Sequence, residues 1–534
     1  MASTHDLSEL VREAAADRPD RLALVEAGGR GLTWAQLEDE VARFATGLGD
    51  AGLVAGQRVL VALGNRLEFV TTYLGVLRAQ LVAVPVNTGA TPGELARMIA
   101  DSGSRVLLAD EGTAPAVREA VRIVLAGRDG DRSELSDDLV SRSHAPRLHV
   151  HGTDPQGDEQ PLTALRADTI RPTPPLPDPE KLACLLYTSG TSGRPRAAML
   201  THRALLANIE QAAQVEPQLI HGDDVVLGVL PLFHVYGLNA VLGSVLRHRA
   251  KLVIVERFDP TETLDLIEDE AISVVPVAPP VFAYWAPAEH LRERLGPVRL
   301  MLSGSAPLSP ELIDEFSKLT GIPVHQGYGL TEAAPIVTST LCSKLLQAGS
   351  VGAALPGIEI KLVDDSGQQP EGEDAGEIWI RGDNLFSGYW PDGEGGPEPD
   401  GWWGTGDVGF LDGTGDLFLV DRLKELVIVS GFNVYPVEVE EVIREAPEVA
   451  DAAVIGTGDP ATGEAVVAYV RPTDPGADPA AVEAAAAHCA QRLARFKQPA
   501  RVEVVDALPL TVTGKVQKGR LRGIERRRAL GLLE

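Results

Sequence analysis

Seven short apolar runs lie in the first 304 residues and alternate with polar or helix-like segments. They are RVLVAL (58–63), LVAVPV (81–86), RVLLAD (105–110), DVVLGVLPL (224–232), KLVIVE (251–256), SVVPVAP (273–279) and VRLMLSG (298–304). Runs this short and this continuous are typical of strands that are buried on both faces. Their alternation with helical patterns is typical of sheets covered by helices. The sequence therefore predicts an α/β fold with largely buried strands.

The length and charge of the chain constrain its organisation and its partners. Hydrophobic cores stop growing at roughly 250 to 300 residues, so a chain of 534 residues is expected to form at least two domains. A net charge of −28 favours solubility and disfavours nucleic acids and anionic membranes as partners. Cys184, Cys342 and Cys489 are far apart and lack CxxC spacing, which argues against a disulfide framework or a thiolate zinc site. We expect a cytoplasmic protein.

Two segments could be mistaken for membrane signals. The first twenty residues are acidic where a secretory signal would be basic, and their pattern predicts a short amphipathic helix. Residues 225–246 carry no formal charge and are long enough to cross a bilayer. Pro231, His234 and Asn239 interrupt this stretch, so we interpret it as a buried strand, a loop and a packed helix. No membrane span is expected.

Residues 128–180 are polar and rich in proline, which predicts an irregular surface connector and not a domain. Within it, His149 and His151 alternate as metal ligands on one face of a strand could. The sequence offers no third ligand nearby, and a protein zinc site needs at least three. We therefore expect two exposed side chains here and no metal site.

The segment LLYTSGTSGRPR (185–196) is a strand-forming run that breaks into a loop of glycines and hydroxyl residues. Small residues let backbone N–H groups approach phosphate oxygens, while hydroxyls add donors and Arg196 adds positive charge. The loop does not fit the GxxxxGK[ST] pattern of the Walker loop. Read alone, it fits a phosphate cradle and a surface turn equally well.

Seven further motifs follow in a fixed order. They are PLFHVYGL (231–238), SGSAPL (303–308), QGYGLTE (326–332), GWWGTGD (401–407), DRLKEL (421–426), GFNVYP (431–436) with Glu438, and PLTVTGK (509–515). Together with the loop, they closely resemble the adenylate-forming superfamily of acyl-CoA synthetases, aryl-CoA ligases, luciferases and peptide-synthetase adenylation domains. The resemblance runs from about residue 20 to 522. It implies a large N-terminal multi-layered α/β domain (1–421) and a small mobile C-terminal α+β domain (422–534), with Lys424 at the hinge.

The resemblance also implies a reaction in two steps. A carboxylic acid and ATP give an acyl-adenylate and pyrophosphate, and coenzyme A then gives the acyl-CoA and AMP. The first step brings two anions together while charge builds on the departing pyrophosphate, so positioned cations and N–H donors are needed. The expected cofactors and co-substrates are ATP, Mg²⁺ and coenzyme A.

Site residues follow from the motif positions. The catalytic assignments are Lys515 between carboxylate and α-phosphate, His234 as a gate beside the carboxylate, Arg422 near ribose and phosphate, and Thr331 on phosphate. Glu332 and Thr191 are assigned to Mg²⁺. Nucleotide and CoA contacts are assigned to Thr188, Ser189, Gly190, Thr191, Ser192, Gly193, Arg196, Gln326, Gly327, Tyr328, Asp407, Lys424, Gly431 and Phe432. Tyr328 would lie against adenine, Asp407 would accept from ribose, and Gly431 would let pantetheine pass.

One departure affects the phosphate loop. Where the family continues Pro-Lys-Gly, this chain has Pro195-Arg196-Ala197, which keeps the charge but replaces a compact ammonium with a broad guanidinium. We expect a partial loss of ATP affinity or rate.

A second departure bears on the substrate. Amino-acid-activating relatives have an Asp where this chain has His234, so an uncharged acid is expected. The pocket candidates are small or apolar, which suits an alkyl chain or an aromatic ring: Val235, Tyr236, Gly304, Ser305, Ala306 and Ala333. Medium- or long-chain fatty acids are the leading substrate class, and aryl acids are the second.

Several alternatives stay open at the level of sequence. The acceptor could be a separate acyl carrier protein in place of CoA, and a luciferase-like oxygenase shares the first half-reaction. A nucleotide-binding pseudoenzyme weakened by Arg196 would bind ATP without turnover. The basic run 515–528 could attract CoA phosphates or form a solvated helical face. The sequence does not determine the oligomeric state.

Overall fold

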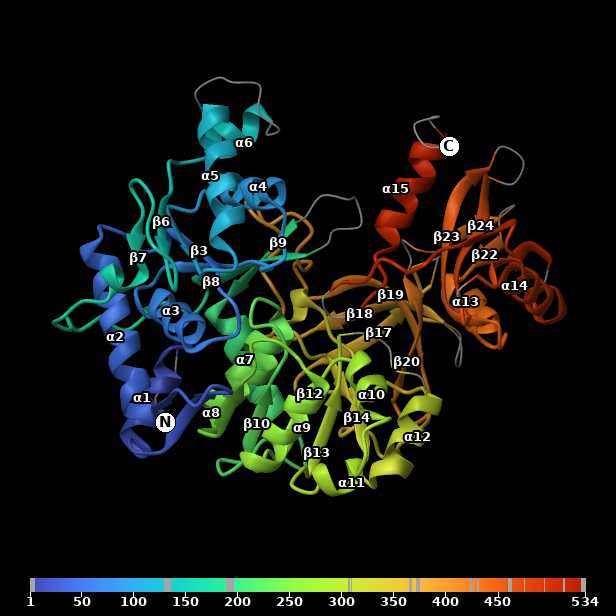
Figure 1. Cartoon of the computed structure of the whole chain (residues 1–534), viewed down its shortest axis with the longest axis horizontal. Helices are drawn as coiled ribbons and strands as arrows, with labels where there is room; N and C mark the ends of the chain where they lie inside the picture. The colour runs from blue at the N-terminus through green and yellow to red at the C-terminus, as the bar shows by residue number, and fades with distance from the viewer. Residues whose placement is uncertain are drawn as a thin grey trace.

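The computed structural model describes most of the chain. The described residues are 5–128, 136–188, 196–305, 308, 310–364, 367–370, 375–422, 425, 427–429, 432–459, 463–474, 476–493, 495–511 and 514–529. Within them, two seven-stranded sheets form the N-terminal part, followed by a four-stranded and a five-stranded sheet (Figure 1). All seven apolar runs form strands, so the predicted α/β fold is confirmed.

The first seven-stranded sheet is built mainly from the N-terminal 200 residues. Its order is β7 (Gln160–Pro161), β6 (Arg147–Val150), β5 (Val106–Ala109), β3 (Arg58–Ala62), β4 (Val82–Pro85), β8 (Leu182–Thr188) and β9 (Arg196–Thr201). All neighbours pair in parallel except β8 and β9. Helices α4 (Pro92–Ser102), α5 (Ala114–Arg128) and α6 (Asp137–Arg142) follow β4 and β5. The antiparallel β8–β9 pair brings Thr188 and Arg196, which flank the candidate phosphate-binding loop, together at one edge of this sheet.

The second seven-stranded sheet has the order β14 (Val324–Gln326), β13 (Leu300–Ser303), β12 (Val274–Val277), β10 (Val225–Gly228), β11 (Lys251–Ile254), β1 (Leu22–Glu26) and β2 (Gly31–Thr33). Only β1 and β2 pair antiparallel. Its outer face packs on α9 (Pro260–Asp269), α10 (Pro280–Trp285), α11 (Leu291–Arg294) and α12 (Pro310–Thr320).

A layer of helices lies between the two sheets and forms the main core. It contains α1 (Glu9–Asp17), α2 (Trp34–Asp50), α3 (Leu67–Arg78), α7 (His202–Ala213), the π-helix η2 (Tyr236–Gly243) and α8 (Ser244–His248). The amphipathic helix predicted near the N-terminus is α1, which buries Leu10, Val11 and Ala14. Outer cores on the far face of each sheet complete an αβαβα arrangement.

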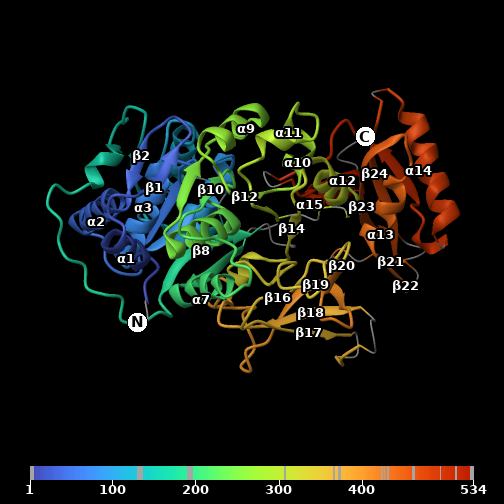
Figure 2. The same ribbon diagram turned by 90° about the horizontal axis from the view of Figure 1, so that it is seen from below.

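The remaining elements follow η3 (Thr331–Ala333) and the small pair β15 (Thr338–Ser339) and β16 (Ala353–Ala354). An antiparallel meander comprises β17 (Glu359–Val363), β18 (Gly376–Arg381), β19 (Trp403–Leu411) and β20 (Leu417–Arg422). The C-terminal sheet contains β21 (Val427–Val429), β22 (Phe432–Val434), β23 (Val449–Asp459), β24 (Gly463–Pro472) and β25 (Arg501–Val504). It packs with α13 (Pro436–Arg444), α14 (Asp478–Arg492), η4 (Arg495–Lys497) and α15 (Lys518–Ala529), at the right of Figure 2.

Residues 225–246 form β10, a loop, η2 and α8, which confirms the interpretation as a strand, a loop and a helix. Among the described residues, no helix combines the length and the apolar character that crossing a membrane requires.

The interpretation of 128–180 as an irregular connector was incomplete. Part of this segment forms η1 (Leu162–Leu165), the edge strand β7 and its neighbour β6. Leu148 and Val150 of β6 pack into the core beneath α5. The expected exposure of His149 was wrong, because it is 5% exposed and burial lowers its pKa. A four-residue strand such as β6 needs only two apolar side chains, so the surrounding prolines and polar residues concealed it.

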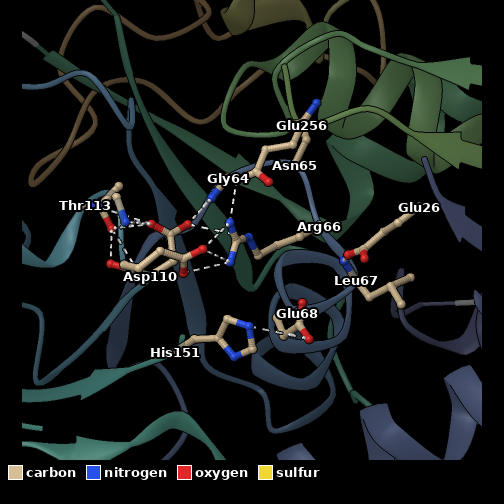
Figure 3. Close-up of polar contacts among 12 residues, drawn as sticks. Glu26, Gly64, Asn65, Arg66, Leu67, Glu68, Asp110, Thr113, His151 and Glu256 are labelled. Atoms are coloured by element: carbon tan, nitrogen blue, oxygen red, sulfur yellow. Dashed lines mark hydrogen bonds and ion pairs between the residues drawn. The ribbon is translucent and has the colours of Figure 1, made fainter. Parts of the chain in front are cut away.

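A charged network joins the two large sheets near the carboxyl ends of β3, β5 and β11 (Figure 3). Arg66 follows β3, and its guanidinium pairs with Asp110 at 3.7 Å, with Glu111 at 3.1 Å, and with Glu256 from the second sheet. The carboxylate of Asp110 also accepts the Gly64 N–H at 2.7 Å. Arg66 and Asp110 are buried, so each charge compensates the other. The network ties the first sheet to the second.

Candidate active site

One cavity of about 620 Å³ brings together segments from across the chain. Its wall includes the ends of β8 and β9, the loop before η2, the ends of β13 and β14, η3, and part of β19. Thr511 and Lys515 complete the wall from the C-terminal part. Ligands bind most often where parallel strands end, because loops and helix starts converge there. The cavity is thus placed as a functional site of an α/β protein would be.

A hydrogen bond fixes the nucleotide-side candidates. The Tyr328 hydroxyl donates to Asp407 Oδ2 at 2.6 Å, and both residues are buried at the cavity wall. Gly327 precedes this tyrosine, and a Cβ added there would lie 2.3 Å from the Thr338 carbonyl oxygen. Only glycine therefore allows this close approach of two backbone segments. The arrangement leaves a tyrosine ring and a carboxylate on the same side of the cavity.

On another wall, a tyrosine contacts both charged candidates. The Arg196 guanidinium carbon lies 3.8 Å from the centroid of the Tyr389 ring. The Tyr389 hydroxyl donates to Glu332 Oε1 at 2.7 Å. Burial and the neighbouring Glu332 raise the pKa of Tyr389, which therefore remains a donor. Sequence reasoning missed Tyr389, because the sequence Gly-Tyr-Trp-Pro (388–391) shows nothing of its partners 57 and 193 residues away.

His234 and Lys515, the two candidates for contact with the acid, both line the cavity, and we call their part of it the acid side. Burial, and then the positive charge of Lys515, lower the pKa of His234 to about 4. A turn holds Lys515: its N–H donates to Thr511 Oγ1 at 3.0 Å, and Gly514 has a φ of +82°. A Cβ at Gly514 would lie 2.7 Å from Pro280 of α10, so the turn packs directly against the N-terminal part. A neutral imidazole and a lysine therefore share one wall.

A mostly aliphatic extension of the cavity runs along η2 and α8. Tyr236, Ala240, Val241 and Ser244 line one side of it. The strands of the second sheet and the loop before β10 contribute Leu219, Ile220, Val226, Val274, Pro276 and Leu302. Gly304 makes room for the Tyr236 ring, because a Cβ there would lie 2.6 Å from Tyr236 Cε1. This extension passes from the carboxyl ends of the strands toward their amino ends.

The structure places most of the candidates named from sequence around this cavity. The wall contains Thr188, Arg196, His234, Val235, Tyr236, Gly304, Ser305, Gln326, Gly327, Tyr328, Thr331, Glu332, Asp407 and Lys515. Ala333 is instead fully buried in the core, and its carbonyl accepts from Asn384 Nδ2 at 2.7 Å. Arg422 pairs in register with Asp407 at the end of β20, and Phe432 begins β22. The candidates Ser189, Gly190, Thr191, Ser192, Gly193, Ala306, Lys424 and Gly431 lie outside the described residues.

The oxygen donors at the cavity fit Mg²⁺. Glu332 is 8% exposed, and the hydroxyl residues Thr188 and Thr331 line the same wall. In the described part of the chain, no group of three or more His, Cys, Asp or Glu side chains could hold a metal by itself. Mg²⁺ is usually bound by one or two carboxylates together with substrate phosphates. The set therefore suits a cation that arrives with a nucleotide.

Comparisons with known proteins agree with this geometry. The family model "AMP-binding enzyme" matches residues 11–390, and "AMP-binding enzyme C-terminal domain" matches residues 438–515. The chain is 32% identical to 4-coumarate–CoA ligase 5 of Oryza sativa subsp. japonica, covering 97% of this chain and 94% of the relative. It is 33% identical to a long-chain-fatty-acid–CoA ligase of Yersinia pestis, with the same two coverages.

A solved structure shares both the fold and the sequence. ATP-bound MatB from Rhodopseudomonas palustris has a TM-score of 0.85 at 31% identity, covering 98% of this chain and 99% of that one. The apo structure of the same protein gives a TM-score of 0.73. The matches extend over nearly the whole chain, and both sequence relatives are acid–CoA ligases. The chain therefore belongs to the AMP-binding enzyme family, among its acid–CoA ligases.

Proposed function

We propose that this acid–CoA ligase activates a carboxylic acid that carries no charged group besides its carboxylate, with medium-chain fatty acids as the leading substrates. The observation that carries the proposal is one cavity with a lysine and a neutral histidine beside an aliphatic extension, and an arginine and a carboxylate on another wall. The charged groups suit a phosphate chain, and the apolar extension suits an acyl chain.

In the first step, a carboxylate oxygen of the acid forms a bond to the α-phosphorus of ATP, and the bond to the pyrophosphate oxygen breaks. Lys515 lines the cavity, and in this proposal it holds the carboxylate and the α-phosphate together as negative charge develops. His234 is neutral near pH 7, so it offers a hydrogen bond without trapping the carboxylate as an ion pair. Bound Mg²⁺, held by Glu332 and phosphate oxygens, would neutralise charge on the departing pyrophosphate.

The position of the C-terminal domain supports the proposal that this structure shows the arrangement used in the first step, which we call the adenylating pose. Gly514 packs on Pro280, and Lys515 lines the cavity beside His234. The higher TM-score to ATP-bound than to apo MatB agrees with that pose. We place the domain boundary near Arg422, where the meander ends and the chain enters the C-terminal sheet. A rotation there would withdraw Lys515 after the first step.

In the second step, the CoA thiol attacks the acyl carbon, the bond from that carbon to AMP breaks, and the thiol proton is released. The withdrawal of Lys515 would open the acid side of the cavity to pantetheine. CoA is the leading acceptor because both sequence relatives are CoA ligases. An acyl carrier protein is the alternative acceptor, and analysis of the products formed with each one distinguishes them.

The depth of the aliphatic extension favours medium chains. From Tyr236 to Ser244 the helical path rises roughly 10 to 12 Å at about 1.5 Å per residue. The same 620 Å³ cavity must also hold part of the nucleotide, which limits the acyl chain. Aryl acids are a second candidate, because the hydroxyls of Ser303 and Ser305 lie buried at the cavity without a hydrogen-bond partner in the described structure. A ring hydroxyl could satisfy them.

The test is pyrophosphate release from ATP with saturated acids of rising length and with benzoic and cinnamic acids, each with and without CoA. We expect release to depend on the acid, to rise with CoA and to be greatest for medium-length alkyl acids. A clear preference for the ring acids would replace our leading substrate with the second. ATP binding without release for any acid would support the pseudoenzyme alternative.

A further inference from the structure

Arg196 stands where the family pattern has lysine, and the structure shows what its guanidinium contacts. Its carbon lies 3.8 Å from the centroid of the Tyr389 ring, which is a stacking distance. A planar guanidinium can lie flat on an aromatic face, whereas an ammonium is a compact point charge on a flexible stem. The Tyr389 ring therefore supports this side chain through the planar shape of the guanidinium.

The backbone holds Tyr389 firmly in place. It forms a bridge with Ala198 of β9, the strand that begins with Arg196. The N–H of the next residue, Trp390, donates to the Ala197 carbonyl at 2.9 Å. The Tyr389 and Phe386 rings pack in a T-shaped arrangement, with the ring centroids 5.0 Å apart. The tyrosine is thus fixed to the same strand as the arginine that it supports.

The far end of the same side chain reaches the other charged group. The Tyr389 hydroxyl donates to Glu332 Oε1 at 2.7 Å, and Tyr389, Glu332 and Arg196 all line the cavity. Partners that hydrogen-bond to a metal-binding carboxylate orient it toward the metal. One tyrosine therefore contacts a phosphate-binding candidate with its ring and a metal-binding candidate with its hydroxyl.

We propose that Tyr389 is a positioning residue that sets Arg196 and Glu332 at a fixed spacing, so that both meet the phosphates of Mg–ATP. The inference rests on the proposed function, in which this wall binds the phosphates. It also gives the departure at Arg196 a physical account: the chain keeps a broad cation because an aromatic ring lies beneath it. The hydroxyl acts through the metal-binding carboxylate, and the ring acts through the guanidinium.

Two variants separate these roles. Tyr389→Phe removes the hydroxyl and keeps the ring, whereas Tyr389→Leu removes both. We would measure ATP binding to the whole chain by calorimetry without any acid, once with rising Mg²⁺ and once in EDTA. For Tyr389→Phe we expect the apparent Mg²⁺ affinity of the ATP complex to fall about tenfold, with ATP binding in EDTA unchanged.

For Tyr389→Leu we expect ATP binding in EDTA to weaken as well, by about three- to tenfold, because the guanidinium loses its aromatic face. Arg196→Met should produce a similar loss in EDTA, and combining it with Tyr389→Leu should add little. Tyr469→Phe is the matched control. It removes another hydrogen bond from a tyrosine to a carboxylate, the one that Tyr469 of β24 donates to Glu525 of α15, and neither residue lines the cavity. This control should change neither binding measurement.

Equal loss for Tyr389→Phe with Mg²⁺ and in EDTA would show a merely structural effect and overturn the proposal. If the losses in ATP binding caused by Arg196→Met and Tyr389→Leu add fully in the double variant, the part of the proposal that concerns Arg196 is overturned. Thermal unfolding of each variant identifies any that fails to fold. If Tyr389→Leu does not fold, Tyr389→Phe, which keeps the ring packing, decides whether Tyr389 is a positioning residue. Because these assays contain no acid, a wrong choice of substrate class would leave their outcome intact.

Discussion

Replacing Lys515 with methionine removes the positive charge from the acid side of the cavity and keeps a long side chain. Lys515 lines this cavity and is close enough to His234 to lower its pKa, and we propose that the carboxylate and the α-phosphate meet there. Removing one preorganised group of this kind costs about 10²- to 10³-fold in kcat, or roughly 3 to 4 kcal/mol. We expect Lys515→Met to slow acid-dependent pyrophosphate release by that factor.

The same variant should move a second, independent observable. Burial is the larger cause of the low pKa of His234, and the charge of Lys515 is the smaller. Without Lys515, the pKa should rise from about 4 but stay below its ordinary 6.5. Titration of the His234 ring signals by NMR would measure it. A loss in rate of less than tenfold, or an unchanged His234 pKa, would refute the assignment of Lys515 to this wall.

The sign of the pH effect on stability follows from the same shift. His234 has a lower pKa in the folded chain than in the unfolded chain, so the unfolded chain binds more protons between about pH 6.5 and 4. Its contribution to stability is therefore complete above pH 6.5 and is lost as the pH falls toward 4. Lys515→Met should narrow the pH range over which this stability is lost. Chemical denaturation at pH 5 and pH 7.5 would show this as a smaller difference in the free energy of unfolding between the two pH values.

Three further predictions follow from the packing. Arg66→Met should destabilise the folded chain by roughly 3 kcal/mol, because the Asp110 carboxylate stays buried without its partner. Glu256→Gln should cost at most about 1 kcal/mol, because the Glu256 side chain is more than half exposed. Equal shifts of the thermal unfolding temperature for the two variants would contradict this account of the network. Ile220→Trp should fill the deep end of the aliphatic extension and shift the preferred acid to shorter chains without changing KM for ATP; an unchanged chain-length profile would place the acyl chain elsewhere. Gly514→Val should slow acyl-adenylate formation at least tenfold, because φ at this position is +82° and Pro280 leaves no room for a Cβ. Thioester formation from a supplied acyl-adenylate should persist. Loss of both steps would mean that the variant is generally unfolded.

Much of the fold could be predicted because its strands carry a local signal. The apolar runs at 58–63 and 298–304 became buried strands, since a strand covered on both faces needs a continuous apolar sequence. Strand β6 was missed because His149 and Arg147 interrupt its pattern, and pairing with β5 and β7 supplies what local propensity does not.

The candidate site was predicted through motifs, and its contacts were not. Glu332 and Arg196 were named from their motif positions, yet nothing in their motifs indicated that one tyrosine contacts both. Ala333, adjacent to Glu332, turned out to face the core, because successive side chains of the short 3₁₀-helix η3 point in directions about 120° apart.

By itself, the sequence determined the strand-forming runs, the order of the motifs and the family to which they lead, because these depend on residue type and spacing along the chain. Only the tertiary structure decided that Lys515 lies in the same cavity as His234, 281 residues away, and that Tyr389 contacts Arg196 and Glu332. Such contacts depend on how separate sheets and domains pack. Packing is set by the sum of many weak, non-local interactions, and no single segment encodes it.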